Sequence, residues 1–362
     1  MSTTSPARVV VADDSALMRN IVSRSLTKAG IEVVGSARDG DEALALCERE
    51  RPDAMTLDLT MPGLDGLGVL RALRERSDTN IPVVVVSAFS AAHGARAVDA
   101  LAEGAFDLVS KPTASESLDA FVDALGAKVK LAAASRRKPG SHQSQNGSAP
   151  IVPPWRTPHG GDVAVTPRRV RSAAKVSRVV LIATSTGGPR ALAALVPKLP
   201  APLGLGTLIV QHMPAGFTGS LASRLDASSA LNVVEATGGE TVNPRTALLA
   251  PGGRHLRLAP DGRTTLTDDA AVGGLRPRAD LLIQDAARAY RERLLLVVLT
   301  GMGNDGLAGA REVHRNGGRI LVESEESCTV YGMPRAIVDG GLADDVLDLS
   351  RLPEAIAAEA RA

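Results

Sequence analysis

Short apolar runs alternate with amphipathic stretches along the first 125 residues. The stretches at 15–28, 41–50 and 66–75 repeat apolar residues at helical spacing, and helical patterns also follow the later runs. The apolar runs between them have the length of strands and lie at 8–12, 33–36, 54–57, 83–86 and 106–109. Strands that alternate with helices in this way form βαβ units, so the pattern predicts a doubly wound parallel sheet.

The same alternation resumes at residue 178 and predicts a second α/β domain. Its expected strands are 178–183, 206–211, 231–235, 246–250, 294–299 and 319–323. Helical spacing is found near 188–196, 217–225, 279–292, 306–316 and 333–340. Residues 254–258 and 263–267 are expected to form a hairpin. This pattern again predicts a doubly wound α/β sheet.

A segment without apolar periodicity separates the two domains. It is rich in Pro, Ser, Gly, Gln and Arg, which is typical of a flexible linker. Residues 131–178 hold nine basic residues and a single acid, Asp162. We expect this charge to be solvated, although contact with the acidic remainder of the chain or with an anionic partner stays open. The predicted division is therefore 1–126, a basic linker at 127–176, and 177–362.

Composition narrows the class of protein. The 362 residues are 44% hydrophobic and 22% charged, as in soluble globular proteins. A net charge of +1 and 2% aromatics give no indication of nucleic-acid binding. No apolar run reaches the roughly 18 residues of a membrane span, and the N-terminus lacks a signal peptide's apolar core, so no membrane insertion is expected. Cys47 and Cys328 lie in different predicted domains with no second ligand nearby at metal spacing, so neither a disulfide framework nor a zinc site is indicated, which favours a cytoplasmic location.

Acidic residues gather at the expected strand ends of the first domain. Asp13 and Asp14 follow the first strand, Asp58 the third and Lys111 the fifth. The carboxyl ends of parallel strands share one crevice, so these groups should converge there and hold a divalent, oxygen-seeking cation such as Mg²⁺. Asp58 is then a plausible nucleophile for phosphoryl transfer, with Lys111 and the Ser87 hydroxyl stabilising the added oxygens. A single Asp at a strand end would be read as a helix cap, whereas the whole set indicates a site.

The sequence around these residues resembles the receiver domain of two-component response regulators, a flavodoxin-like fold. The matching motifs are Val-Ala-Asp-Asp-Ser-Ala-Leu-Met-Arg, Leu-Asp-Leu-Thr-Met-Pro-Gly-Leu-Asp-Gly-Leu, Val-Ser-Ala and Ser-Lys-Pro. The resemblance implies phosphorylation of Asp58 by a histidine kinase. It also implies Mg²⁺ bound by Asp14, Asp58 and the carbonyl of Thr60, with Asp13 contributing. Leu108 stands where many receivers carry an aromatic switch residue, which puts an aromatic readout in doubt.

The second domain carries candidates for nucleophilic catalysis, also at expected strand ends. Ser185 precedes Gly-Gly-Pro at the start of a helix, His212 follows the next strand, and Asp305 lies in a glycine-rich turn. One crevice can collect them as nucleophile, general base and orienting carboxylate. Taken alone, the Thr-Ser-Thr-Gly-Gly turn would be read as a phosphate-binding loop, and His255 is a rival base. The order Ser, His, Asp and the missing Gly-x-Ser-x-Gly motif disfavour an ordinary lipase or esterase.

Together these segments resemble the catalytic domain of the CheB family of chemotaxis protein-glutamate methylesterases. Further matching segments are 217–218, 249–255, 276–280 and 330–334. The resemblance assigns Ser185, His212 and Asp305 to catalysis and suggests that Thr186 and the Met302 N–H lie near the oxyanion. Ala183 and Thr184 depart from the usual Gly-Ala, and Asn304 from the common Ala.

The expected activity is a phosphorylation-activated serine hydrolase. It would demethylate glutamate methyl esters and deamidate glutamines on methylated chemoreceptors, releasing methanol, with no cofactor for the hydrolysis itself. One alternative is a phosphorylation-dependent adaptor whose hydrolase-like domain only docks. Another is a serine peptidase or amidase acting on a different protein. A DNA-binding output is disfavoured because no helix-turn-helix follows the first domain.

Overall fold

The computed structural model describes residues 5–76, 80–88, 91–112, 117–136 and 177–361. The predicted linker at 127–176 therefore lies outside the described residues from 137 onward. None of the helices in the described ranges is long and apolar enough to cross a membrane.

The N-terminal domain is a five-stranded parallel sheet with strand order β2-β1-β3-β4-β5. Its strands are β1 (Arg8–Ala12), β2 (Glu32–Ala37), β3 (Ala54–Leu57), β4 (Val83–Ser87) and β5 (Asp107–Ser110). Its helices are α1 (Ala16–Lys28), α2 (Gly40–Glu50), α3 (Gly66–Glu75), α4 (Ala91–Ala102) and α5 (Leu118–Arg136). Side chains of Ser15, Asp39 and Asp65 cap the first three helices. This strand order is flavodoxin-like and leaves a ligand crevice beyond the carboxyl ends of β1 and β3.

The C-terminal domain contains a seven-stranded sheet with order β14-β13-β12-β6-β7-β9-β8, in which every strand pair is parallel. Its strands are β6 (Val179–Thr184), β7 (Gly206–Gln211), β8 (Asn232–Glu235), β9 (Thr246–Leu249), β12 (Leu294–Val298), β13 (Arg319–Glu323) and β14 (Asp345–Leu347). Helices α6 (Gly188–Leu195), α7 (Thr218–Asp226), α8 (Ala279–Tyr290), α9 (Leu307–Arg315), α10 (Met333–Asp339) and α11 (Leu352–Arg361) complete it, with the hairpin β10 (His255–Leu258) and β11 (Thr264–Thr267). The strand order reverses between β6 and β12, so the crevice lies beside β6.

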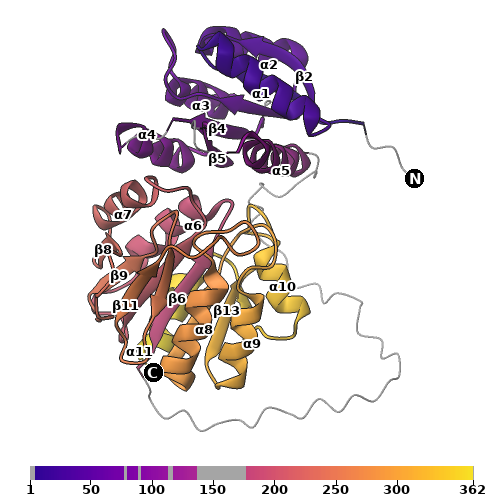
Figure 1. The fold of residues 1–362 in the computed structure, drawn as a ribbon. Coiled ribbons are helices and arrows are strands. Elements are labelled where there is room, and N and C mark those ends of the chain that lie inside the picture. The colour runs from indigo at the N-terminus through magenta and orange to yellow at the C-terminus, as the bar shows by residue number, and fades with distance from the viewer. Residues whose placement is uncertain (1–4, 77–79, 89–90, 113–116, 137–176, 362) are drawn as a thin grey trace, which may run out of the picture.

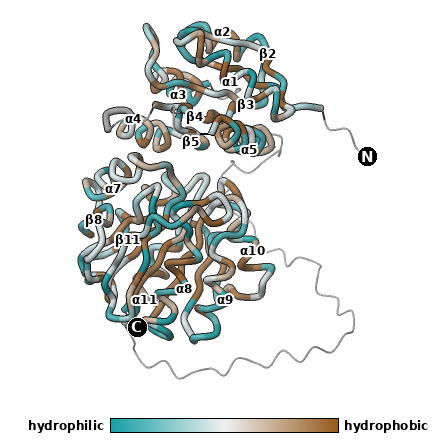
Figure 2. Tube along the Cα trace, viewed as in Figure 1, coloured by the Kyte–Doolittle hydropathy of each residue, from teal (hydrophilic) through white to brown (hydrophobic). Residues whose placement is uncertain are grey.

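Apolar side chains fill both faces of each sheet, and Figure 2 shows the most hydrophobic segments inside the two domains. In the first domain one cluster lies on the side of α2, α3 and α4, and another on the side of α1 and α5. In the second domain alternate β6 residues enter opposite clusters: Val180 and Ile182 join one, Val179 and Leu181 the other. Because these strands are buried on both faces, their sequences are apolar throughout and do not alternate between apolar and polar residues.

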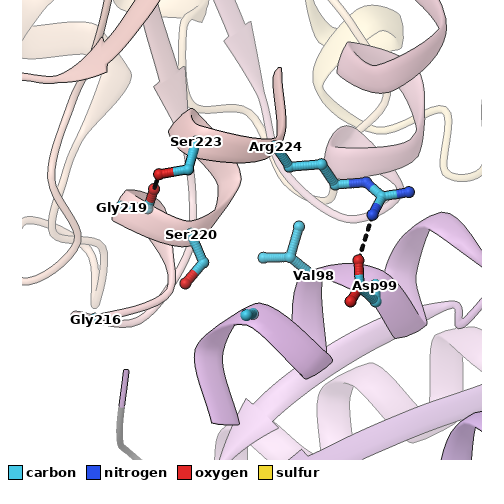
Figure 3. A pocket seen from close by; sticks show the side chains of 8 residues that line it. Val98, Asp99, Gly216, Gly219, Ser220, Ser223 and Arg224 are labelled. Carbon is cyan, nitrogen blue, oxygen red and sulfur yellow. Dashed lines mark hydrogen bonds and ion pairs between the residues drawn. The ribbon is translucent and has the colours of Figure 1, made fainter. Parts of the chain in front are cut away.

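The N-terminal domain packs on the end of the C-terminal domain through α4 and β5 (Figure 1). Helix α4 contacts α6 and α7, and a single buried apolar cluster includes residues of both domains. Val330, in a loop of the C-terminal domain, packs against the cluster under α1 and α5. The open cleft between α4 and α7 is crossed by an ion pair from Arg224 to Asp99 (Figure 3). The two domains thus form a packed interface.

The predicted fold class is confirmed in both domains, and the main differences lie at the ends of segments. Helix α5 continues to Arg136, into the stretch assigned to the linker from residue 127. Strand β14 and helix α11 are absent from the predicted elements. β14 is three residues long and mostly exposed at the sheet edge, so it carries little hydrophobic signal.

Candidate functional site

The predicted carboxylates of the N-terminal domain meet beyond β1 and β3. Oxygen atoms of Asp13, Asp14 and Asp58 lie within 4.8 Å of one another. Asp13 and Asp58 are buried, whereas Asp14 is exposed and opens the cluster to solvent. The three side chains follow β1 and β3, which are neighbours in the sheet. The Asp58 N–H donates to Ala12 O at the end of β1 and so joins the two strand ends. The strand-end argument therefore places these residues correctly.

Lys111 binds two of these carboxylates. Its Nζ lies 2.8 Å from Asp13 Oδ2 and 2.7 Å from Asp58 Oδ2. Burial lowers the pKa of Lys111, but the hydrogen bonds and charges of the two carboxylates outweigh it, so the pKa is raised. Burial chiefly raises the pKa of Asp13, and the lysine opposes that shift. The lysine thus offsets part of the repulsion among the carboxylates.

The residues present fit a divalent cation and a phosphoryl group. Three carboxylates with one exposed member supply the hard oxygen ligands that Mg²⁺ prefers while it keeps water molecules. The Ser87 hydroxyl at the end of β4 is fully buried and has no hydrogen-bond partner within the described part of the chain. Thr60, the expected carbonyl ligand, lies two residues after Asp58 and donates its N–H to Asp58 Oδ1 at 3.4 Å. The unpartnered hydroxyl is suited to an added phosphoryl oxygen.

Ser185 lies in a tight turn between β6 and α6. Gly187 adopts φ +80° as the N-cap of α6, and a Cβ on it would lie 2.4 Å from Thr329 Cβ. A Cβ on Gly301 would lie 2.8 Å from Ser185 Cβ, so the loop after β12 approaches the serine closely. The main-chain N–H of Ser185 donates to Thr300 O at 3.0 Å. Glycine is thus required at both positions, because a Cβ there would meet the side chains of neighbouring residues.

His212 and Asp305 are in direct contact. His212 Nε2 lies 2.7 Å from Asp305 Oδ2, and both side chains are almost completely buried. His212 Nδ1 is buried and has no hydrogen-bond partner among the described residues. Because Asp305 occupies Nε2, Nδ1 is the ring nitrogen left to accept a proton from a neighbouring hydroxyl. Asp305 is in place to fix the tautomer.

A network of donors surrounds Asp305. The carboxylate accepts main-chain N–H groups of Ala279, Asp280 and Gly306 at 2.7 to 2.9 Å. Arg278 Nε lies 2.8 Å from Asp305 Oδ1. Burial raises the pKa of Asp305, but the hydrogen bond and charge of His212 and these N–H groups outweigh it and hold the pKa at about 2. The carboxylate therefore stays ionised beside the imidazole.

The residues predicted near the oxyanion lie on different loops. The Thr186 hydroxyl donates to Asp107 of the N-terminal domain at 2.6 Å. Met302 is 44% exposed on the loop that follows Gly301. Thr184, one of the departures from the family pattern, donates its hydroxyl to Thr300 O at 2.9 Å and so ties β6 to the loop after β12.

His255 is held in a structural position. It is fully buried, its Nδ1 accepts the Arg278 N–H at 3.2 Å, and its Nε2 lies 3.2 Å from Ala270 O. Both ring nitrogens are therefore engaged by the main chain. Among the described residues it is His212, not His255, whose ring contacts Asp305.

Comparisons with known proteins identify the families of the two domains. The family model of the CheB methylesterase matches residues 180–356, and that of the response regulator receiver domain matches residues 9–123. A protein-glutamate methylesterase/protein-glutamine glutaminase of Symbiobacterium thermophilum is 42% identical over 355 residues, which cover 97% of this chain and 96% of that protein. The chain belongs to the CheB methylesterase family.

Other members of the family resemble it to a similar degree. A protein of Myxococcus xanthus, named protein-glutamate methylesterase/protein-glutamine glutaminase 5, is 43% identical over 351 residues and is covered over 95% of its length, as is this chain. The crystal structure of the Thermotoga maritima CheB methylesterase catalytic domain is 42% identical, with a TM-score of 0.49, and covers 50% of this chain and 98% of that one. The family predicted from the motifs is confirmed.

Three residues of this methylesterase domain and its receiver were not predicted. Arg278 and Asp280 form a pair at 2.8 Å beside Asp305, and Asp107 contacts Thr186 from the other domain. The segment 276–280 was noted only as a family motif. Asp280 is buried in the first turn of α8 and Arg278, just before the helix, is partly buried. Charged side chains at the start of an otherwise apolar helix are the available signal, because such groups are seldom buried without a partner. Asp107 at the head of a buried strand is a signal of the same kind.

Proposed function

We propose that this protein is a phosphorylation-activated serine hydrolase that removes methyl groups from glutamate methyl esters of chemoreceptors. The same site would deamidate glutamines of those receptors. The contact of His212 with Asp305, beside the turn that carries Ser185, is the observation that carries the proposal. The names of the relatives support the choice of substrate class.

The chain's own residues suffice for acyl transfer. Ser185 Oγ attacks the ester carbonyl while His212 Nδ1, the unpartnered ring nitrogen, takes its proton. His212 then gives that proton to the departing methanol, and water releases the acyl group from Ser185 by the same route. Asp305, ionised with a pKa of about 2, stabilises the imidazolium. Main-chain N–H groups of the Ser185 turn and of Met302, with the Thr186 hydroxyl, are our candidates for the oxyanion site.

Phosphorylation of Asp58 is the proposed signal, with a chemotaxis histidine kinase as phosphodonor. Asp13, Asp14 and Asp58, with the Thr60 carbonyl, would hold Mg²⁺, which supplies charge neutralisation for the phosphoryl group when bound. Lys111 and Ser87 would then contact the phosphoryl oxygens. The hydrolytic reaction needs none of these residues, so we assign the hydrolase no cofactor of its own.

The packed interface suggests how the signal acts. Residues 186 and 330, on loops beside Ser185 and Thr300, contact the receiver. We therefore propose that the unphosphorylated receiver restricts access to Ser185 and that phosphorylation shifts the population toward an open arrangement. We place the protein in the cytoplasm, where its kinase and the methylated receptor segments would meet it, and both of its cysteines are free thiols.

Methanol release from methyl-labelled receptor membranes tests the proposal. The full chain is assayed with Mg²⁺, with and without a small phosphodonor, beside Ser185→Ala and Asp58→Asn. We expect release that rises with the donor, none from Ser185→Ala, and unstimulated release from Asp58→Asn. Ester hydrolysis that persists in Ser185→Ala would reject the serine mechanism, and equal release with and without donor would reject the switch.

A further inference from the structure

One hydrogen bond joins the two proposed sites more directly than the rest of the interface. Thr186 Oγ1 donates to Asp107 Oδ2 at 2.6 Å, and both residues are buried. Thr186 directly follows Ser185, and its own carbonyl accepts the Thr300 hydroxyl at 2.9 Å. The receiver thus touches the residue next to the nucleophile, within the loop pair that forms the catalytic turn.

The direction of this bond matters for catalysis. A hydroxyl group has a single hydrogen to donate, so Thr186 cannot donate to an oxyanion while Asp107 accepts from it. A bond to an ionised carboxylate is also stronger than one to a neutral acceptor. Coverage by the receiver would only hinder entry of substrate. This bond in addition makes the Thr186 hydroxyl hydrogen unavailable to the oxyanion.

Asp107 is held in place by hydrogen bonds within the receiver domain. Its Oδ1 accepts Lys128 Nζ at 2.8 Å and the Leu108 N–H at 2.7 Å, which leaves Oδ2 for Thr186. The carboxylate therefore keeps a cation and a main-chain donor when Thr186 leaves. Opening exposes no unpaired buried charge, so the bond is suited to repeated release.

We propose that Asp107 is a positioning residue that inhibits the hydrolase by holding the Thr186 hydroxyl on the receiver. This inference rests on the proposed function and specifies how its site is regulated. Strand β5 begins at Asp107 and ends one residue before Lys111, which contacts Asp58. Leu108, next to Asp107, is aliphatic and buried, and the Asp107 carboxylate reaches Thr186 of the catalytic turn.

Another interface carboxylate offers a matched control. Asp99 on α4 pairs with Arg224 on α7 across the open cleft (Figure 3), and both side chains are more than 40% exposed. Exposed pairs of this kind contribute little to stability. Asp99→Ala therefore removes the same group from the same interface without touching the catalytic turn.

The test compares the wild type, Asp107→Ala and Asp99→Ala in the full chain with Mg²⁺. Without phosphodonor we expect Asp107→Ala to release methanol about tenfold faster than the wild type, as loss of a charge-assisted hydrogen bond implies. Asp99→Ala should stay within about twofold of the wild type. With donor, the wild type and Asp107→Ala should converge. An unchanged basal rate in Asp107→Ala, or an equal rise in Asp99→Ala, would overturn the inference.

Hydrogen exchange of the peptide that contains residues 185–191 provides a readout independent of hydrolysis. Without donor, Asp107→Ala should exchange faster there than both the wild type and Asp99→Ala, because the turn is released from the receiver. Absence of methanol release from every sample would reject the proposed function, and the exchange data would still decide the inference. Equal exchange in all three proteins would refute it.

Discussion

Arg278 provides the sharpest test of how the catalytic carboxylate is held. Its guanidinium lies 2.8 Å from Asp305 Oδ1 and 2.8 Å from Asp280 Oδ2. The side chains of Arg278 and Asp280 are 16% and 10% exposed, and that of Asp305 is 1% exposed. Asp280 in turn accepts the N–H groups of Gly306 and Gly309. Arg278→Met keeps much of the side-chain volume and removes the cation between two carboxylates.

The expected loss follows from this burial. Removing one partner of a buried ion pair costs about 3–5 kcal/mol because a charge is left unpaired. Both carboxylates keep main-chain donors and the guanidinium is partly exposed, so we expect the lower end, about 3 kcal/mol of the free energy of unfolding. Arg276→Met is the matched control, since Arg276 is exposed and its guanidinium donates to the main-chain oxygens of Asp268 and Asp269. That variant should change stability by less than about 0.5 kcal/mol.

Urea denaturation of the full chain, followed by circular dichroism, measures these values. The sole tryptophan, Trp155, lies outside the described residues, so fluorescence would not report on the catalytic domain directly. The double variant Arg278→Met with Asp280→Asn should recover about half of the loss, because one of the two repelling charges is gone. A loss below about 1 kcal/mol, or no recovery in the double variant, would refute the reasoning.

The pH dependence of Arg278→Met has a definite sign. Burial already raises the pKa of Asp280 above its usual 3.8, and Arg278 opposes that rise. Without Arg278 the folded-state pKa rises further, so the ionised carboxylate destabilises the fold above that pKa and the protonated form does not. The deficit in unfolding free energy should therefore shrink as the pH falls from 7 toward 4.

Three further outcomes follow from the geometry. Asp305, with a folded pKa of about 2 against 3.8 unfolded, should contribute about 2 kcal/mol of stability above pH 4 that is lost as the pH falls through 2, and Asp305→Asn should lack this component in acid titration of unfolding. Gly301→Ala places a Cβ 2.8 Å from Ser185 Cβ and 2.5 Å from Met333 Sδ, so kcat/KM for methanol release should fall about tenfold or more while receiver phosphorylation is unchanged. Chelation of Mg²⁺ should abolish stimulation by phosphodonor and leave basal methanol release intact, which parallel assays with and without donor would show.

The sequence predicts most of the fold because its strands are buried on both faces. Runs such as 294–298 and 179–184 are almost purely apolar and are buried throughout. The strand-end rule then brings Ser185, His212 and Asp305 to neighbouring strands of one sheet. These predictions depend on local pattern and on topology, both of which a single sequence carries.

Contacts between segments that are distant in the sequence could not be predicted in this way. Asp107 and Thr186 are 79 residues apart and belong to different domains, so no local period relates them. Arg278 and Asp305 meet only because the start of α8 lies beside the turn that follows β12. The buried charges could be suspected from their apolar or helical surroundings, but their partners depend on tertiary packing that propensity and spacing do not specify.

The interface has to be strong enough to inhibit and weak enough to open. Shifting an equilibrium from 1:99 to 99:1 requires about 5.5 kcal/mol of differential binding. The exposed pair of Asp99 with Arg224 contributes about 0–1 kcal/mol, and one bond to an ionised carboxylate about 1.5–3 kcal/mol. The Thr186 bond is therefore the larger polar contribution of the two, and Asp107 begins the strand that ends one residue before Lys111. A phosphoryl group on Asp58 that displaced β5 slightly would remove a large part of the closed-state advantage and return the hydroxyl to the catalytic turn in the same event.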